Sequence, residues 1–309
     1  YRSHSFPTRR SSDLFKLFTV FFLLSLIGFS QISKIHYIPP LTANDLQQGG
    51  GGSIPYDQHL YLSTPSTSDV TVKITILSTG QEITYTDLRN DNPKVYQLTA
   101  DNPNQEQALN GVLFVDKDGT GSNRLSSGLV IDADCPVYAS IRYNAGAQAG
   151  ALVSKGDASL GTHFRTGMMT NGNQSDENEF QNSTNSHNLN FISVMATQDN
   201  TTVRIDLPNA SPNLQIANYN YNGNPIVQTL NRNESMIIAA DARQPNNSGE
   251  NRFALIGALV RSIDDSGTVI VEDPTKPIVV NVGSASGTFM STEGGHDHGV
   301  DQIVGLDRV

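Results

Sequence analysis

The chain has 309 residues, of which 16% are charged, and its 30 acidic residues outnumber its 20 lysines and arginines, giving a formal net charge of -10. Such an acidic chain is a poor candidate for a nucleic-acid-binding protein, because phosphates are bound by clustered Lys and Arg. The single cysteine, Cys135, excludes an intrachain disulfide. A buried core must therefore supply the stability, and we expect Cys135 to be buried in it as a small hydrophobe.

The first 30 residues are predicted to lie outside the folded protein. The letters HSFPTRRSSDL, residues 4–14, are the translation of a common sequencing adapter, so we expect residues 1–14 to be foreign. Residues 15–30, FKLFTVFFLLSLIGFS, are typical of a secretory signal peptide: one lysine, an apolar run, and small or polar residues at the end. The run is shorter than the roughly 20 apolar residues of a membrane span. We therefore expect a secreted or cell-surface protein with no membrane span in the mature chain.

The remaining chain reads as short strands almost throughout. Segments rich in Val, Ile, Thr and Tyr alternate with turns containing Gly, Pro, Asn or Asp, and no stretch keeps a period of 3.6 residues for three turns. This pattern predicts an all-β, antiparallel fold. The expected strands are residues 60–65, 69–77, 81–87, 94–99, 128–134, 136–143, 191–197, 201–207, 225–230, 234–240, 253–260, 267–273 and 277–284.

Two parts of the chain repeat one order of segments. Residues 61–74 resemble residues 192–205, and residues 128–150 resemble residues 267–287. The repeat favours two tandem antiparallel β-sandwich-like modules from an internal duplication, with a β-propeller-like fold as the alternative. We therefore divide the mature chain into an N-terminal segment (31–58), a first β module (59–170), an Asn-rich linker or loop (171–190) and a second β module (191–309), which we expect to be truncated at its C-terminus.

Several motifs, taken in their order, resemble the N-terminal family of IgGFc-binding proteins. They are KIHYIPPL at 34–41, QAGALVSKGDASLGTHFRTG at 148–167, NLNFISVMATQDNTTVRI at 188–205, KPIVVNVGSASG at 276–287 and GVDQIVGLDRV at 299–309. The resemblance is closest to bacterial members at the start of large surface proteins exported by type IX secretion. It implies a non-catalytic binding or adhesion module with an extracellular protein or glycan ligand. Nothing in the residues themselves indicates immunoglobulin binding.

Two clusters of polar residues are candidate metal sites. In EGGHDHGVDQ, His296 and His298 are two apart, so on an extended segment both point to one side, and with Asp297 and Asp301 they form a candidate zinc site. Incidental histidines in a solvated loop are the alternative. The letters DKDGTGSNRLSS at 116–127 place Asp116 and Asp118 as in a calcium loop, but the twelfth position lacks the expected glutamate, and an ordinary turn is the alternative. Otherwise no cofactor is expected.

The function is predicted to be binding rather than catalysis. The sequence lacks a nucleophile elbow, a phosphate-binding glycine loop and a HExxH helix. Loops on a rigid β scaffold commonly carry recognition, and Tyr219 and Tyr221 in the loop 209–224 are candidate ligand contacts. An exported polysaccharide-active enzyme, or its carbohydrate-binding part, is the alternative.

Overall fold

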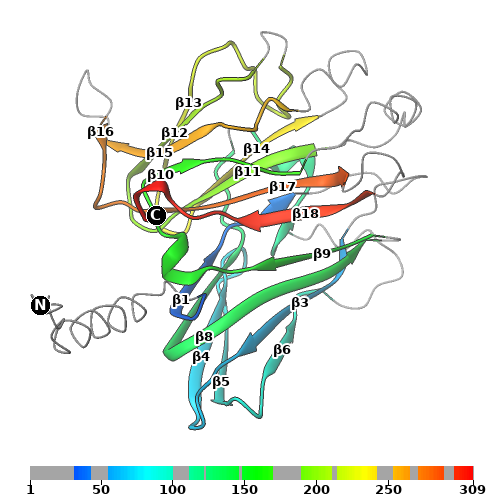
Figure 1. Cartoon of the computed structure of the whole chain (residues 1–309), viewed down its shortest axis with the longest axis vertical. Helices are drawn as coiled ribbons and strands as arrows, with labels where there is room; N and C mark the ends of the chain where they lie inside the picture. The colour runs from blue at the N-terminus through cyan, green and yellow to red at the C-terminus, as the bar shows by residue number, and fades with distance from the viewer. Residues whose placement is uncertain are drawn as a thin grey trace, which may run out of the picture. The chain divides into compact units, whose positions relative to one another are not determined.

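The computed structural model describes residues 31–42, 55–99, 111–121, 123–145, 148–169, 189–210, 214–241, 253–264, 271–288 and 296–308. In these residues the regular structure is antiparallel β-sheet apart from one short parallel pair and brief 3₁₀ turns, which confirms the predicted all-β class (Figure 1). None of the helical turns in the described part has the length and apolar character needed to cross a membrane. The predicted adapter and signal segments, and nearly all of the Asn-rich segment, lie outside the described residues.

The strands divide into two sets along the chain. The first set is β1 (Ser33–Ile38), β2 (Leu41–Thr42), β3 (Tyr56–Ser63), β4 (Val70–Ile76), β5 (Gln81–Leu88), β6 (Lys94–Gln97), β7 (Phe114–Val115), β8 (Leu129–Ala145) and β9 (Gln148–Val153), with 3₁₀ turns η2 (Lys117–Gly119) and η3 (Gly156–Ser159). The second set is β10 (His163–Arg165), β11 (Leu189–Ala196), β12 (Thr201–Asp206), β13 (Ile226–Leu230), β14 (Ser235–Asp241), β15 (Leu259–Asp264), β16 (Val271–Glu272), β17 (Ile278–Thr288) and β18 (His296–Gln302), with turn η6 (Leu306–Arg308).

Strand β8 is continuous where the sequence predicted two strands. Its first part pairs with β4 and β1, and its second part pairs with β3 and β9. The register against β1 shifts around the change-over, where Pro136 has no N–H to give to a ladder. Residues 134–136 are exposed there. The prediction that Cys135 is buried is therefore wrong: the thiol lies at the exposed change-over between two sheets.

The order of strands is the same in both sets. In the first set, the orders are β5-β4-β8-β1 and β6-β3-β8-β9, with β8 shared between them. In the second set, they are β13-β12-β15-β10 and β14-β11-β17-β18. Strand β10, which the sequence placed in the first module, pairs with β15 and so belongs structurally to the second set. The two sets repeat one topology, as an internal duplication predicts.

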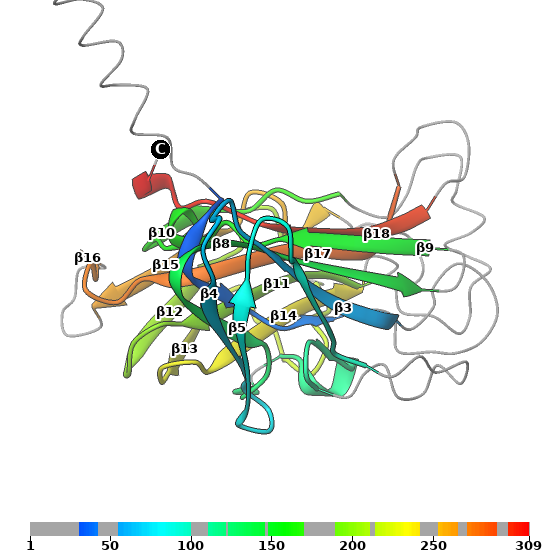
Figure 2. The ribbon, with the colours of Figure 1, turned by 90° about the horizontal axis from the view of Figure 1, so that it is seen from below.

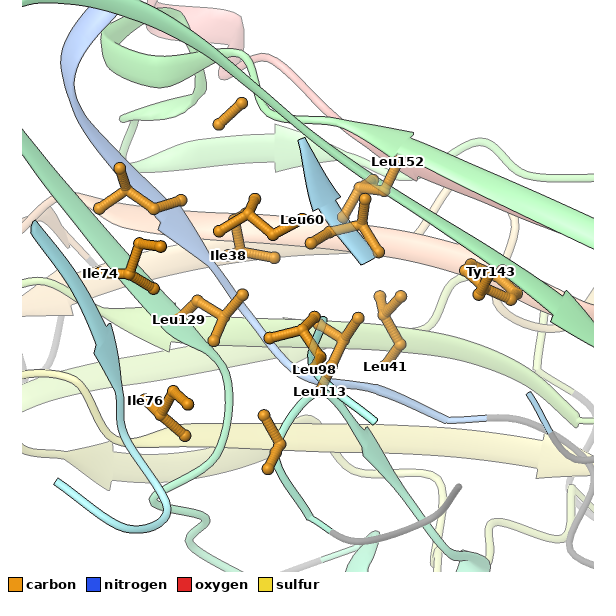
Figure 3. Close-up of a cluster of buried hydrophobic side chains, with 14 of the residues drawn as sticks. Ile38, Leu41, Leu60, Ile74, Ile76, Leu98, Leu113, Leu129, Tyr143 and Leu152 are labelled. Atoms are coloured by element: carbon orange, nitrogen blue, oxygen red, sulfur yellow. The ribbon is translucent and has the colours of Figure 1, made fainter. Parts of the chain in front are cut away.

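The sheet β14-β11-β17-β18 is covered on both faces. Every residue of β11 is buried, and alternate residues belong to different clusters. Phe191 packs in the core that holds Ile38, Leu60 and Leu129 of the first set, part of which Figure 3 shows. Its neighbour Ile192 packs in the core of the second set. This explains why β11 is apolar at neighbouring positions, such as Phe191 and Ile192, whereas a strand with one face in solvent alternates between apolar and polar residues.

A buried glutamine ties the two sets of strands together. Gln302, at the end of β18, donates from Nε2 to the Tyr37 carbonyl of β1 at 2.9 Å and to Asn281 Oδ1 of β17 at 3.2 Å. Its Oε1 accepts from the Lys155 amide at 2.7 Å and from Ser154 Oγ at 3.1 Å. Strands β9 and β18 lie side by side in both views (Figure 1, Figure 2). Strand β18 therefore connects the two sets of strands, which form one compact unit over residues 31–309.

Candidate ligand-binding groove

A groove of about 950 Å³ lies on the outer face of the sheet formed by β3, β8 and β9. Its lining combines aromatic, charged and amide side chains with a patch of very small residues. The lining residues are Tyr56, Asp57, His59, Tyr61, Arg142, Tyr143, Asn144, Ala149, Gly150 and Ala151.

Strand alternation places the polar side chains in the groove. In β3, Leu60 and Leu62 point into the core, so His59 and Tyr61 point outward. In β8, Arg142 stands directly opposite His59, and Asn144 follows two residues later on the same face. These polar residues of the groove thus occupy solvent-facing positions of strands whose other face is core, whereas the lining residue Tyr143 is itself buried in that core.

Small residues of β9 form the floor of the groove. Ala149, Gly150 and Ala151 follow one another where β9 pairs with β8. A Cβ atom on Gly150 would lie 2.2 Å from Cζ of Tyr143, closer than any real contact, so only glycine fits there. Because β9 adds almost no side-chain volume, the surface is hollow beside the taller side chains of β3 and β8.

A bulge in β3 sets the position of Asp57. The register between β3 and β8 shifts between Tyr56 and His59, and Asp57 has a φ of 48°, in the left-handed region that non-glycine residues seldom adopt. Its Oδ2 accepts a hydrogen bond from Asn144 Nδ2 at 3.1 Å, and its carbonyl lies 2.8 Å from Nδ1 of His59. Backbone strain of roughly 1–3 kcal/mol is commonly retained at functional sites, where it aims a side chain.

Arg142 is the cation of the described groove lining, and no described carboxylate pairs with it. Its guanidinium carbon lies 5.2 Å from the centre of the Tyr61 ring, and the His59 ring lies 6.2 Å from the same ring. Arg142 is exposed, and among the described residues no carboxylate lies within ion-pair distance of it. The Tyr61 ring thus holds a guanidinium whose N–H groups remain available to a ligand.

Exposed apolar side chains continue from the groove across the same sheet. The register aligns Val95 of β6, Tyr61 of β3 and Val153 of β9 in one row, with Ser140 of β8 between the last two. Val95, Tyr61 and Val153 are 49%, 37% and 41% exposed, and Tyr138 of β8 is 40% exposed on the same face. Exposed apolar side chains gathered on one face mark interaction surfaces more often than scattered ones do.

The predicted zinc-site residues lie on β18, where they make structural contacts. His298 is buried edge-on to the Tyr143 ring, with centroids 5.6 Å apart, and its burial lowers its pKa to about 4. Asp297 Oδ1 accepts from the Ala149 amide of β9 at 2.8 Å. The backbone of His296 begins β18 opposite Thr288. Within the described ranges no three His, Cys, Asp or Glu side chains are grouped to hold a metal ion, so zinc binding stays a prediction.

Asp301 forms an exposed ion pair, and its loss should change the free energy of unfolding only slightly. Its Oδ2 lies 3.0 Å from Lys155 Nζ, and the Asp301 side chain is 58% exposed. Pairs of this kind contribute about 0–1 kcal/mol, since water already solvates both charges. We therefore expect Asp301→Asn to lower the free energy of unfolding by less than about 1 kcal/mol in urea titration. A loss that is larger, and that persists at high salt, would show that Asp301 has a partner other than Lys155.

The predicted calcium-loop residues act as turn residues. Asp116 caps the turn η2, with Oδ1 accepting from the Gly119 amide at 2.8 Å. Asp118 is exposed and lies 3.1 Å from Lys117 Nζ. Each carboxylate thus serves the turn itself, which is the ordinary role of Asx residues between strands. Calcium binding here stays a prediction.

Tyr219 and Tyr221 are half-buried rather than displayed. Both pack against the core of the second set of strands. Burial raises the pKa of Tyr221, and the nearby Tyr219 and Asp206 add to this shift. They do not line the groove, whose residues His59, Tyr61 and Arg142 the sequence analysis did not select. The sequence signal for these residues was the alternation in HLYLS and ASIRY, which places His59 and Tyr61 on one face of β3 and Arg142 on the solvent-facing side of β8.

The second set of strands carries the recognisable family signature. A family model described as IgGFc binding protein matches residues 149–309, from β9 through η6, whereas most of the groove lies in the preceding part. No curated protein and no solved structure matches the chain. Since the family match covers more than half of the 309 residues, this chain belongs to the IgGFc-binding protein family.

Proposed function

We propose that the chain is a non-catalytic binding module of an exported surface protein, and that it holds an extracellular ligand in the groove of β3, β8 and β9. The observation that carries the proposal is Arg142, which stacks on Tyr61 and has no carboxylate partner among the described residues, inside a groove that continues into exposed apolar side chains. Aromatic and arginine side chains dominate binding energy where proteins meet ligands. The family assignment supports a binding role, and the signal-like residues 15–30 support export; adhesion at the cell surface is proposed from the two together.

The number of carboxylates in the described groove lining supports ligand binding over glycoside hydrolysis. Glycoside hydrolysis ordinarily uses two carboxyl groups across the scissile bond, about 5–9.5 Å apart. The described lining contributes one carboxylate, Asp57, and it already accepts a hydrogen bond from Asn144. The alternative of a polysaccharide-active enzyme would need a second carboxylate in this lining, whereas a binding site has no such requirement.

Truncation of Tyr61 is expected to weaken binding while preserving the fold. The purified chain is tested against immobilised immunoglobulin G and a glycan array, which separate a protein ligand from a glycan ligand. Binding to one of these probes is expected, and Tyr61→Ala should weaken it at least tenfold, because the ring contacts the ligand and holds Arg142. Circular dichroism should be unchanged, since Tyr61 is 37% exposed.

Val227→Ala is the control, because Val227 of β13 is 46% exposed on another sheet and does not line the groove. It should change affinity by less than about threefold, since most of the binding energy comes from a few residues inside a site. Equal affinities of Tyr61→Ala and the unmodified chain would reject the groove as the site. New reducing ends released from any glycan on incubation would reject the non-catalytic assignment.

A further inference from the structure

We propose that the groove recognises an acidic glycan, with Arg142 binding a sugar carboxylate and the Asp57–Asn144 pair binding neighbouring hydroxyls. This inference rests on the proposed function and names the ligand class for the same site. It is carried by the juxtaposition of two features: the Arg142 guanidinium, which rests on the Tyr61 ring with no carboxylate partner in the described part of the chain, and the hydrogen-bonded pair of Asp57 and Asn144.

The state of Arg142 points to an anionic ligand group. The chain has a net charge of -10, and eight of its described lysines and arginines lie within ion-pair distance of a carboxylate, as Arg204 and Arg261 do with Asp206 at 2.7 Å. Arg142 instead rests on an aromatic ring and is exposed in a groove. Guanidinium presents a planar fork that matches a carboxylate with two parallel hydrogen bonds. Because the chain is negatively charged overall, its long-range field repels anions. An anionic ligand therefore has to be bound by specific contacts such as this pair of hydrogen bonds.

The Asp57–Asn144 pair supplies what sugar hydroxyls require. Asn144 donates one of its two N–H groups to Asp57 Oδ2, which leaves its second N–H as a donor. Among the described residues, no side-chain hydrogen bond uses Asp57 Oδ1 or the side-chain Oδ1 of Asn144, so both serve as acceptors. A hydroxyl is at once donor and acceptor, and a fixed pair that offers both suits it. Asn144 and Arg142 are two residues apart on one face of β8, about 7 Å along the strand, so neighbouring substituents of one sugar can reach both.

The strand pairing argues for a glycan over an extended acidic peptide. Peptides that bind β-sheets commonly add a strand at a free edge, where backbone groups are unpaired. The groove instead lies on the face of three strands that are paired with one another, so its recognition groups are side chains. The rings of Tyr56 and Tyr61 add apolar surface with a polar end, which suits a ligand whose faces are apolar and whose rim is polar.

The test compares carboxylated glycans with their neutralised forms. Polygalacturonate, alginate, hyaluronan and polysialic acid are each immobilised, alongside the same polymers after methyl esterification, and poly-glutamate represents an acidic peptide. We expect the chain to bind at least one native glycan at least tenfold more tightly than its ester and than poly-glutamate. Arg142→Gln should abolish this preference, because the amide cannot form the charged, two-pronged contact. Arg124→Gln is the matched control: it removes the same charge from an exposed arginine outside the groove and should leave the preference for the native glycan intact.

The outcomes separate this inference from the proposed function. The acidic-glycan inference would be overturned if native and esterified glycans bound equally well. It would also be overturned if Arg142→Gln kept the same preference for native glycans as the unmodified chain. If Tyr61→Ala still loses affinity in that case, the groove remains the site and only the ligand class is wrong. Tighter binding to poly-glutamate would replace the glycan with an acidic peptide. Failure to bind any of the four carboxylated glycans would also overturn the inference.

Discussion

Replacement of Phe191 by alanine is expected to lower the free energy of unfolding by about 3–5 kcal/mol. Phe191 is fully buried on β11 and packs in the core that contains strands of the first set. Its ring also occupies the space above Gly283, where a Cβ atom would lie 2.7 Å from Phe191 Cζ. Because β11 is hydrogen-bonded on both edges, the backbone cannot move in to fill the cavity. Urea titration followed by tyrosine fluorescence measures the loss.

The same experiment tests whether the two sets of strands unfold together. Phe191 lies in the second set by sequence but in the core of the first set by packing, so its loss should shift one cooperative transition to lower urea. Phe253→Ala is the matched control, because Phe253 is 48% exposed, and it should cost about 1 kcal/mol or less. Two separate transitions, with one of them unaffected by Phe191→Ala, would contradict a shared core.

The strands could be predicted from sequence because side-chain direction in a strand alternates residue by residue. The alternation in β4, VTVKITI, predicts a half-buried strand, and the structure buries its Val and Ile residues. The prediction of a strand at 253–260 is wrong over residues 253–258, which form a turn before β15 begins at Leu259. Gly257 has a φ of 74°, which ends any extended run, and apolar letters alone do not reveal this.

The site was harder to predict, because the sequence shows which side chains share a face but not which face is covered. In β3 the outward positions hold His59 and Tyr61, and they line the groove. Strand β11 takes the place of β3 in the second set, yet there Phe191 and Ser193 are buried by packing between layers. Likewise, the sequence suggests that His298 is an exposed ligand in a loop. In the structure it is buried, because Tyr143 of β8 packs against it. Whether a strand face is buried in this way depends on contacts with segments that are distant in the sequence, and the residues of the strand alone do not reveal these contacts.

Acidification is expected to remove about 3 kcal/mol of stability through His298 alone. Burial against Tyr143 lowers the pKa of His298 from 6.5 to about 4, while the nearby Asp297 opposes this shift only in part. The unfolded chain therefore takes up a proton at a higher pH than the folded chain does. The stabilisation is complete above pH 6.5 and is lost as the pH falls from 6.5 to about 4. Buried His36, whose pKa is also lowered by burial, acts in the same direction.

His298→Phe isolates this contribution, because phenylalanine keeps the edge-on ring contact with Tyr143 and cannot take up a proton. Nε2 of His298 is buried with no hydrogen-bond partner among the described residues, so the substitution also removes an unsatisfied polar atom and should not destabilise the chain at pH 7.5. The difference in free energy of unfolding between pH 7.5 and pH 4, from urea titrations, should shrink by about 3 kcal/mol in His298→Phe. His59→Phe, a substitution on the sheet surface, should retain the full difference. An unchanged pH dependence in His298→Phe would mean that the imidazole is solvated and that β18 does not seal against Tyr143 as described.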